Sequence, residues 1–310
     1  MNRYSFVIPC YRSERTIEKV VNEIIEIMKQ KKNDSYEIIL VNDCSPDGVW
    51  EVISKLANEH DNIVGISLAK NFGQHAALMA GYSRTTGDYI VSLDDDGQTP
   101  IDQLDVLLDK MNEGYDVVYA YYEEIKQKAY RKAGTWIANK LAESMLDMPK
   151  GFKGSSFYVA KRFIIDEILK YQNAYPYLGG LVFRTTKNIA NVKTHHRDRI
   201  EGTSGYSFRK LVSLWLNGFT AFSVKPLEFG VYFGTFISGL GFIYAIYIII
   251  NKLMGNTGVE GWSSITSLLL IIGGIILIML GLIGEYVGRI YISINNSPQY
   301  VICNEVDRRR

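Results

Sequence analysis

Short apolar runs alternate with amphipathic segments over the first half of the chain. Five of these runs have the length and composition of buried strands, and they begin near residues 4, 36, 63, 88 and 116. Between the first two, apolar residues recur at helical spacing, at Ile17, Val20, Val21, Ile24 and Met28. Strands that alternate with helices in this way form a mostly parallel sheet with helices on both faces. The pattern therefore predicts an α/β domain.

The pattern changes after about residue 225. Phe229–Ile250 is a stretch of 22 residues without a charge, and Trp262–Gly284 is a second such stretch of 23. A helix needs about 20 apolar residues to cross a bilayer. Because only the short connector 251–261 separates the two stretches, the sequence predicts a transmembrane hairpin, with spans at about 229–250 and 262–284.

Basic residues flank the outer ends of this hairpin. Lys225 precedes the first stretch, and Arg289 and Arg308–Arg310 follow the second, whereas the connector contributes Lys252 as its basic residue. Loops rich in Lys and Arg stay on the cytoplasmic side of a membrane. We therefore expect a multi-pass protein of the inner (plasma) membrane, with the N-terminal domain and both termini in the cytoplasm.

A helix with an apolar stripe is expected just before the hairpin, over residues 206–225. Its stripe contains Trp215 and Phe219, and Arg209 and Lys210 lie on the same helix. This composition suits a helix at the bilayer interface. A helix of the domain core is the alternative.

Composition excludes several classes of protein. The 34 basic and 33 acidic residues nearly balance, so no overall field attracts nucleic acid. Cys10, Cys44 and Cys303 are isolated, which predicts neither a disulfide framework nor a zinc site. The chain lacks Gly-x-Gly-x-x-Gly after its first strand and has no Gly-Lys-Ser/Thr phosphate loop, which argues against a dinucleotide dehydrogenase and a P-loop NTPase.

Three adjacent acids, Asp94–Asp96, follow the expected strand that begins near residue 88. Adjacent carboxylates repel one another, and a bound Mg²⁺ or Mn²⁺ held against a diphosphate would offset that repulsion. A solvated acidic turn is the alternative. However, Pro9–Tyr11, Asp43 and Asn71 also follow expected strands, and parallel strands bring their carboxyl ends to one edge, where ligands bind. The sequence therefore predicts a polar site at this edge.

Six motifs carry a resemblance to a known family. They are Val7–Glu14, Val41–Asp47, Asn71–Gln74, Leu93–Gln98, His196–Tyr206 and Gly284–Arg289. In this order they resemble the family 2 glycosyltransferases of GT-A fold, and within them the polyprenyl-phosphate glycosyltransferases, which are similar to dolichyl-phosphate mannose synthase. Arg12 and Ser13 depart from the family pattern. The resemblance implies a Rossmann-like GT-A domain over 1–205, the interfacial helix over 206–225, the hairpin over 226–288 and a cytosolic tail over 289–310.

The resemblance also implies roles for the residues at the sheet edge. Asp94 and Asp96 are the expected catalytic pair, and with Gln98 they are the expected ligands of Mg²⁺ or Mn²⁺; Gln98 could instead cap the next helix. Asp43 is expected to accept from uracil N3–H, or alternatively to cap a helix. The expected nucleotide-binding residues are Pro9, Tyr11, Glu14, Asp43, Asn71 and Asp95, the last of them near the ribose.

A second group of residues is expected to bind the phosphate of the acceptor lipid. One planar cation and two hydroxyl donors suit a phosphate. The group consists of Arg131, His196, Arg199, Ser204 and Tyr206. Arg131 could alternatively be a solvated surface charge.

One departure from many related enzymes bears on the mechanism. The segment Gly154–Tyr158 contains no acidic residue that could serve as a base. A sugar hydroxyl needs a base to attack, but a phosphomonoester, with its second pKa near ~6, is already mostly dianionic at neutral pH. The sequence therefore favours a lipid-phosphate acceptor. It also predicts that Asp96→Ala abolishes transfer, whereas Ser155→Ala and Ser156→Ala largely retain it.

We therefore expect an inverting glycosyltransferase that moves a sugar from a nucleotide sugar, UDP-linked, to undecaprenyl phosphate at the cytoplasmic face. One alternative is a polyprenyl-phosphate mannosyltransferase that uses GDP-mannose. Another is a non-catalytic membrane protein that binds nucleotide sugars. The sequence leaves open which sugar is transferred and whether the chain forms a homo-oligomer.

Overall fold

The structure, a computed structural model of the 310-residue chain, describes residues 2–31, 33–122, 148–149, 151–195, 225–254, 261–295 and 297–309. The chain forms two compact units. The first contains Met1–Val212 and Asn296–Arg310, and the second contains Ser213–Asn295. The predicted interfacial helix at 206–225 lies almost entirely outside the described residues.

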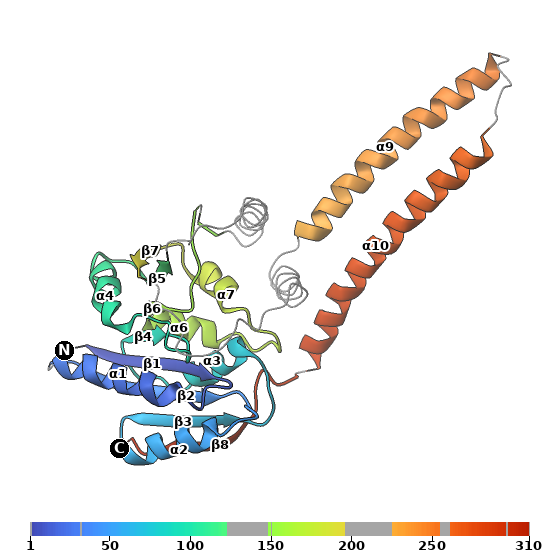
Figure 1. The fold of residues 1–310 in the computed structure, drawn as a ribbon. Coiled ribbons are helices and arrows are strands. Elements are labelled where there is room, and N and C mark those ends of the chain that lie inside the picture. Colours follow the sequence, from blue (N-terminus) through green and yellow to red (C-terminus); the bar gives the residue numbers. More distant parts are fainter. Residues whose placement is uncertain are drawn as a thin grey trace. The chain divides into compact units, whose positions relative to one another are not determined.

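The first unit is built on an eight-stranded sheet (Figure 1). Its order is β7-β5-β6-β4-β1-β2-β3-β8. β6 and β8 run antiparallel to their neighbours, while the other neighbouring strands pair in parallel. The strands are β1 Arg3–Cys10, β2 Ser35–Asn42, β3 Ile63–Leu68, β4 Tyr89–Ser92, β5 Val117–Tyr122, β6 Tyr158–Lys161, β7 Ile189–Thr194 and β8 Ile302–Asp307.

Helices cover both faces of this sheet. α1, α2 and α4 pack on one face, and α3 and α6 on the other, where α7 packs on α6. The helices are α1 Ile17–Gln30, α2 Val49–Glu59, α3 Gln74–Tyr82, α4 Leu104–Asn112, α6 Arg162–Leu169 and α7 Leu178–Thr185, with a short 3-10 turn, η1, at Ile101–Gln103. The mostly parallel α/β fold expected from the sequence is confirmed, and the first five strands begin within two residues of their predicted positions.

The central strands are apolar on both faces because both faces are covered. β1 is buried from Tyr4 to Cys10, and β2 is buried from Glu37 to Asn42 with an apolar run over Ile38–Val41. α3 approaches the sheet especially closely at Gly81, where an added Cβ would lie 2.4 Å from Val7 Cγ1. A glycine at this position therefore permits the close packing of α3 that sets its first residue at the carboxyl edge of the sheet.

The C-terminal segment differs from its predicted role as a tail. β8 pairs antiparallel with β3 and covers an edge of the sheet (Figure 1). The Ala69 N–H also donates to the Val301 carbonyl at 2.8 Å. A single strand of mixed polar and apolar residues has no local signal that distinguishes it from a tail, because its pairing depends on β3, more than 200 residues earlier. Strand β7 and helix α7 were likewise not anticipated.

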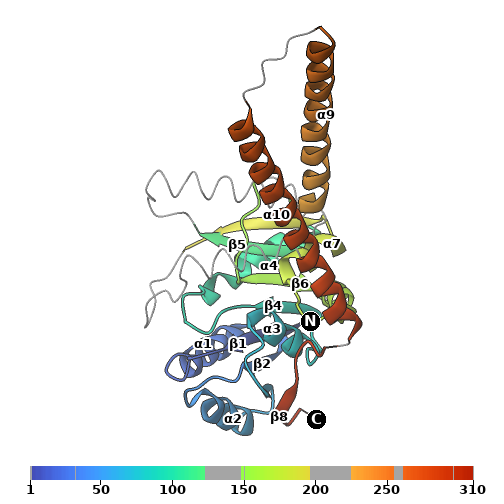
Figure 2. The ribbon, with the colours of Figure 1, turned by 90° about the vertical axis from the view of Figure 1, so that its right-hand side faces the viewer.

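The second unit contains two long helices, α9 Lys225–Leu253 and α10 Trp262–Ile294 (Figure 2). Both helices of the predicted hairpin are therefore present, and α10 continues ten residues beyond the predicted end of the second span. Large apolar side chains such as Phe242, Leu277 and Ile278 are exposed. By length and composition, Ile271–Ile292 could cross a membrane, with a mean hydropathy of 2.1, and Gly230–Tyr244 is a shorter apolar stretch.

Candidate functional site

The predicted polar site lies at the carboxyl edge of the parallel strands, where four loops are joined by hydrogen bonds. The Tyr11 N–H after β1 donates to Asp95 Oδ2 after β4 at 2.9 Å. The Arg12 N–H donates to Ser45 Oγ after β2 at 2.8 Å. Arg12 and Cys44, both in these loops, have left-handed backbone, with φ of 60° and 51°. Such strained backbone in non-glycine residues is concentrated at functional sites.

Asp95 is hydrogen-bonded to the loop after β1. Its carboxylate accepts from the Tyr11 N–H. Desolvation, together with the charge of Asp94, raises the pKa of Asp95 to about 6, although hydrogen bonds from Ser13 and the Tyr11 N–H act to lower it. The central acid of the triplet therefore joins two loops of the site.

Asp94 is held by two side chains from different elements. Gln74 Nε2, at the start of α3, donates to Asp94 Oδ1 at 2.9 Å. The Ser156 hydroxyl, in the loop before β6, donates to Asp94 Oδ2. Neither donor is charged, so neither compensates the negative charge of the carboxylate.

Asp96 is held within its own turn, because its Oδ1 accepts from the Gln98 N–H at 3.0 Å. Among the residues that the structure describes, no three His, Cys, Asp or Glu side chains gather as a metal cluster. Mg²⁺ commonly binds through one or two carboxylates together with substrate phosphates. Asp94 and Asp96, as a pair of carboxylates at one strand end, fit a cation of that kind when a diphosphate supplies further oxygens.

Charge from this pair reaches Tyr122 at the end of β5, which is separated from β4 by β6. Burial raises the pKa of the Tyr122 hydroxyl, a hydrogen bond to Ser155 lowers it, and the carboxylates of Asp94 and Asp96 raise it. Tyr122 therefore lies within reach of the charge of these carboxylates, while its side-chain hydrogen bond is to Ser155.

Asp43 anchors the loop that leads into α3. Its Oδ1 accepts from the Phe72 N–H at 2.7 Å and its Oδ2 from the Gly73 N–H at 2.9 Å. The side chain is only 3% exposed, and burial raises its pKa despite these two hydrogen bonds. Asn71 Nδ2 donates to the Asp43 carbonyl at 3.2 Å. The helix-capping alternative is not observed, because neither α2 nor α3 has a side-chain cap hydrogen bond. Asp43 instead holds the loop before α3, and each of its carboxylate oxygens keeps a further lone pair.

The other predicted nucleotide-binding residues lie at the same edge. Pro9 is buried within β1, and the Tyr11 side chain is 44% exposed. Glu14 Oε2 accepts from the Gly48 N–H, at the start of α2, and the Glu14 N–H donates to Asp47 Oδ2, both at 3.1 Å. Glu14 thus joins the loops after β1 and β2. The predicted acceptor-phosphate residues Arg131, His196, Arg199, Ser204 and Tyr206 lie outside the described residues.

Gln74 and Ser156 are the site residues that sequence reasoning missed. Gln74 is the last residue of the motif Asn71–Gln74, for which the resemblance implies no role at this position, and the sequence predicts that Ser156→Ala largely retains transfer. A short polar side chain in an irregular segment carries no periodic signal, and its contact with Asp94 spans 62 positions in the sequence.

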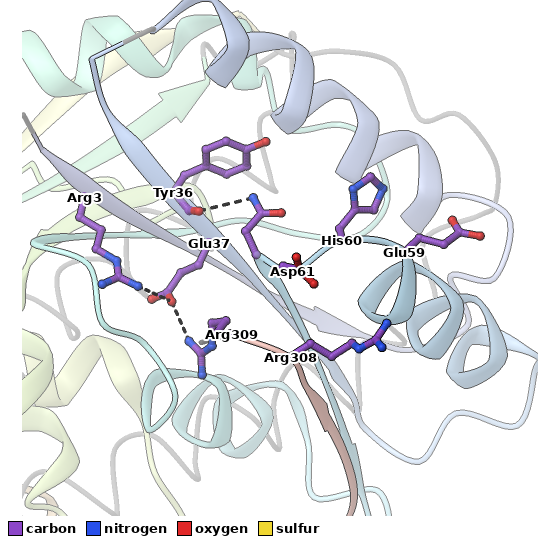
Figure 3. A pocket seen from close by; sticks show the side chains of 9 residues that line it. Arg3, Tyr36, Glu37, Glu59, His60, Asp61, Arg308 and Arg309 are labelled. Carbon is purple, nitrogen blue, oxygen red and sulfur yellow. Dashed lines mark hydrogen bonds and ion pairs between the residues drawn. The ribbon is translucent and has the colours of Figure 1, made fainter.

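A cavity of about 520 Å³ lies at the opposite edge of the sheet, at the amino ends of β1, β2 and β3 (Figure 3). Arg3 and Arg309 converge there on the buried Glu37, and Arg308 lies nearby. The described cations of this cavity already have protein partners, because Arg309 Nη1 is 2.6 Å from Glu37 Oε2 and Arg308 donates to the Asn58 carbonyl. The cavity is separate from the acidic site.

Two protein-family models match the chain. Glycosyl transferase family 2 matches residues 5–212, and the GtrB C-terminal hairpin matches residues 225–290. The chain is 31% identical to an undecaprenyl-phosphate 4-deoxy-4-formamido-L-arabinose transferase of Enterobacter sp. (strain 638), over 99% of this chain and 95% of the relative. It is 30% identical to a bactoprenol glucosyl transferase of Shigella phage SfII, over 97% of each chain.

One solved structure shows a similar fold. It is glucosyl-3-phosphoglycerate synthase from Mycobacterium tuberculosis in complex with Mn²⁺ and UDP-glucose. The TM-score is 0.50 at 19% sequence identity, over 69% of this chain and 75% of the other. The likeness concerns the first unit's α/β fold.

Proposed function

The chain belongs to glycosyl transferase family 2 and has a GtrB-type C-terminal hairpin, and on this basis we propose that it transfers a sugar from a UDP-linked nucleotide sugar to undecaprenyl phosphate at the cytoplasmic face of the membrane. The observation that carries the proposal is the acidic edge after β4, in a chain that matches lipid-phosphate sugar transferases over nearly its whole length.

The nucleotide would bind across the loops that follow β1, β2 and β3. Asp43 is held by two backbone N–H groups, and its remaining lone pairs suit the imide N–H of uracil. Asp95 would orient the nucleoside through the loop that contains Tyr11. These interactions support a uridine nucleotide.

Asp94 and Asp96 would hold Mg²⁺ or Mn²⁺, which would neutralise the charge that develops on the departing diphosphate. The transfer itself depends more on how the lipid phosphate and the sugar are positioned than on proton transfer. A phosphate oxygen of the lipid attacks the anomeric carbon, the bond from that carbon to the diphosphate oxygen breaks, and UDP leaves with the electron pair. Attack opposite the leaving group inverts the anomeric configuration.

No base is required in this reaction, because the acceptor phosphate is already deprotonated at neutral pH. The described residues near Asp94 agree with such a mechanism, since Gln74 and Ser156 are neutral donors. The cationic residues predicted to bind the lipid phosphate, including Arg131 and Arg199, remain part of the proposal.

Membrane attachment follows from the second unit. The exposed apolar side chains of α9 and α10 would be stabilised by lipid. The chain leaves the first unit after Val212 and rejoins it at Asn296. If α10 crosses the bilayer, the chain must cross an even number of times, and α9 would be the other span. The basic residues at the outer ends favour a cytoplasmic first unit.

Transfer should be tested with the full-length protein in detergent or vesicles. Undecaprenyl phosphate is incubated with a panel of UDP-sugars and GDP-mannose, with and without Mg²⁺ or Mn²⁺, and the lipid product is identified by mass. We expect one UDP-sugar to yield a lipid-phosphate-sugar in a cation-dependent reaction. Asp96→Ala should lower the rate by about 100-fold or more, on the scale of losing electrostatic stabilisation of a leaving group.

Ser155→Ala is the matched control, because the Ser155 hydroxyl interacts with the Phe157 N–H and with Tyr122, and not with Asp94. It should retain most of the activity. A product that forms only from GDP-mannose would exclude the uridine nucleotide, and binding of nucleotide sugars without any lipid product would favour a non-catalytic protein.

A further inference from the structure

We infer that Gln74 and Ser156 are positioning residues, which together fix the Asp94 carboxylate in the orientation that a divalent cation and a nucleoside diphosphate require. The inference rests on the proposed function, since it deepens the role of the same site. Its basis is the pair of hydrogen bonds to the two oxygens of Asp94, from Gln74 Nε2 and from the Ser156 hydroxyl.

The two donors come from opposite flanks of β4. Gln74 is the first residue of α3, and Asp43 anchors the loop that precedes it through the N–H groups of Phe72 and Gly73. Ser156 lies just before β6, which pairs with β4 in the register Ser92 to Tyr158. The donors are therefore fixed by separate parts of the fold.

Two hydrogen-bond donors fix the orientation of a carboxylate, which a single donor does not. The carboxylate of an aspartate rotates easily about its last side-chain torsion, which has no sharp staggered minima. A single hydrogen bond leaves that rotation largely open, whereas one donor on each oxygen fixes the plane of the group. Because Gln74 and Ser156 are uncharged donors, they orient Asp94 without neutralising its negative charge.

The three adjacent acids differ in their hydrogen-bond partners. Asp95 accepts from a backbone N–H across the site, and Asp96 accepts from the backbone N–H of Gln98 within its own turn. Asp94 accepts hydrogen bonds from two side chains, one to each oxygen. Partners of this kind orient metal ligands, and their loss typically weakens metal binding or activity by roughly 10–100-fold.

If Gln74 and Ser156 only supported the fold, their substitution would lower stability. Gln74 is exposed, and Ser156 is only half-buried. Hydrogen bonds at such positions contribute little to folding, because water replaces a lost partner. Substitution of either residue should therefore leave stability nearly unchanged, so a large effect on cation binding would not come from unfolding.

The test uses the full-length protein and the variants Gln74→Ala, Ser156→Ala and Ser155→Ala. Binding of Mn²⁺ in the presence of UDP is measured by electron paramagnetic resonance titration, alongside melting temperature, KM for the donor and kcat. We expect Gln74→Ala and Ser156→Ala each to weaken Mn²⁺ binding by about 10-fold or more. Ser155→Ala should bind as the wild type does, and Ser156→Thr, which keeps the hydroxyl, should recover most of the affinity.

A double-mutant cycle shows whether Gln74 and Ser156 act on cation binding through Asp94. In an Asp94→Asn background, Ser156→Ala and Gln74→Ala should cause little further loss, because the group that they position has already been changed. Full additivity in this cycle, or unchanged Mn²⁺ binding in both single variants, would overturn the inference. Loss of transfer in Ser156→Ala with normal Mn²⁺ binding would also overturn it.

The binding measurement separates this inference from the proposed function. If the wild-type protein binds Mn²⁺ with UDP but makes no lipid product, the proposed transfer fails while the positioning of Asp94 is still decided by the variants. If it binds no Mn²⁺ with UDP, both ideas are overturned.

Discussion

At the scale of single residues, hydrogen bonds from distant parts of the chain give chemically identical side chains different surroundings. Asp94, Asp95 and Asp96 are adjacent and equivalent in the sequence, yet they accept from a glutamine and a serine, from the loop after β1, and from their own turn. The same holds for two neighbouring serines. Ser156 contacts Asp94, whereas Ser155 accepts from the Phe157 N–H, which changes our expectation for Ser156→Ala from retained to impaired activity.

His75, next to Gln74 on α3, gives a prediction on pH dependence. Its ring packs edge-on against Tyr177 with 5.4 Å between centroids, and burial lowers its pKa from 6.5 to about 4. Between these two pH values, the unfolded chain binds a proton that the folded chain does not, so stability should fall as the pH drops from 6.5 toward 4. In His75→Phe, which keeps a ring, the melting temperature should fall less over this range.

Tyr177→Phe is the control for this measurement, because it alters the neighbouring side chain but keeps the imidazole. It should show the same loss of melting temperature as the wild type between pH 6.5 and 4. An equal loss in His75→Phe would assign the pH dependence to other groups.

At the scale of elements, β8 attaches the C-terminal segment to the sheet that the N-terminal strands form. It covers β3, and the Arg309 guanidinium just beyond it donates to the buried Glu37 on β2 at 2.6 Å (Figure 3). Burial tends to raise the pKa of Glu37, but hydrogen bonds from Ser5, Thr86 and Arg309 outweigh it and lower the pKa. Glu37 is therefore a buried anion whose partners come from three parts of the chain.

Loss of this arginine should destabilise the first unit. Arg309→Gln removes a cation from Glu37, which is 1% exposed, and leaves the carboxylate with weaker partners. We expect the free energy of unfolding to fall by on the order of 2 kcal/mol, as for a lost hydrogen bond to a buried charge. Thermal or denaturant unfolding measures this.

The neighbouring Arg308 offers a matched control. It donates to the Asn58 carbonyl at an exposed position, so Arg308→Gln should change the free energy of unfolding by less than about 0.5 kcal/mol. Equal effects of the two substitutions would show that Arg309 acts through general charge and not through Glu37.

At the scale of the whole molecule, connectivity constrains how the chain can cross a membrane. The first unit contains both the N-terminal strands and β8, and the chain leaves and re-enters it on either side of the second unit. A folded unit cannot be divided between two sides of a bilayer. We therefore expect both termini to lie on one side of the membrane.

Reporter fusions test this topology. Reporters active only in the cytoplasm should work at Met1 and at Arg310, and should fail when inserted in the connector at residues 255–260. Matching activity at all three positions would mean that the helices do not cross the membrane, and opposite results at the two termini would contradict the pairing of β8 with β3.

The sequence by itself determined the order of strands and helices in the first half of the chain, the acidic edge after β4 and the two apolar helices. These features arise from local patterns, because periodicity and strand-end chemistry are contained within short windows. The tertiary structure alone decided that β8 belongs to the sheet, that Glu14 and Asp43 join loops, and that Gln74 and Ser156 hold Asp94. Those contacts depend on residues that are distant in the sequence, and they form only when the sheet brings the strand ends together.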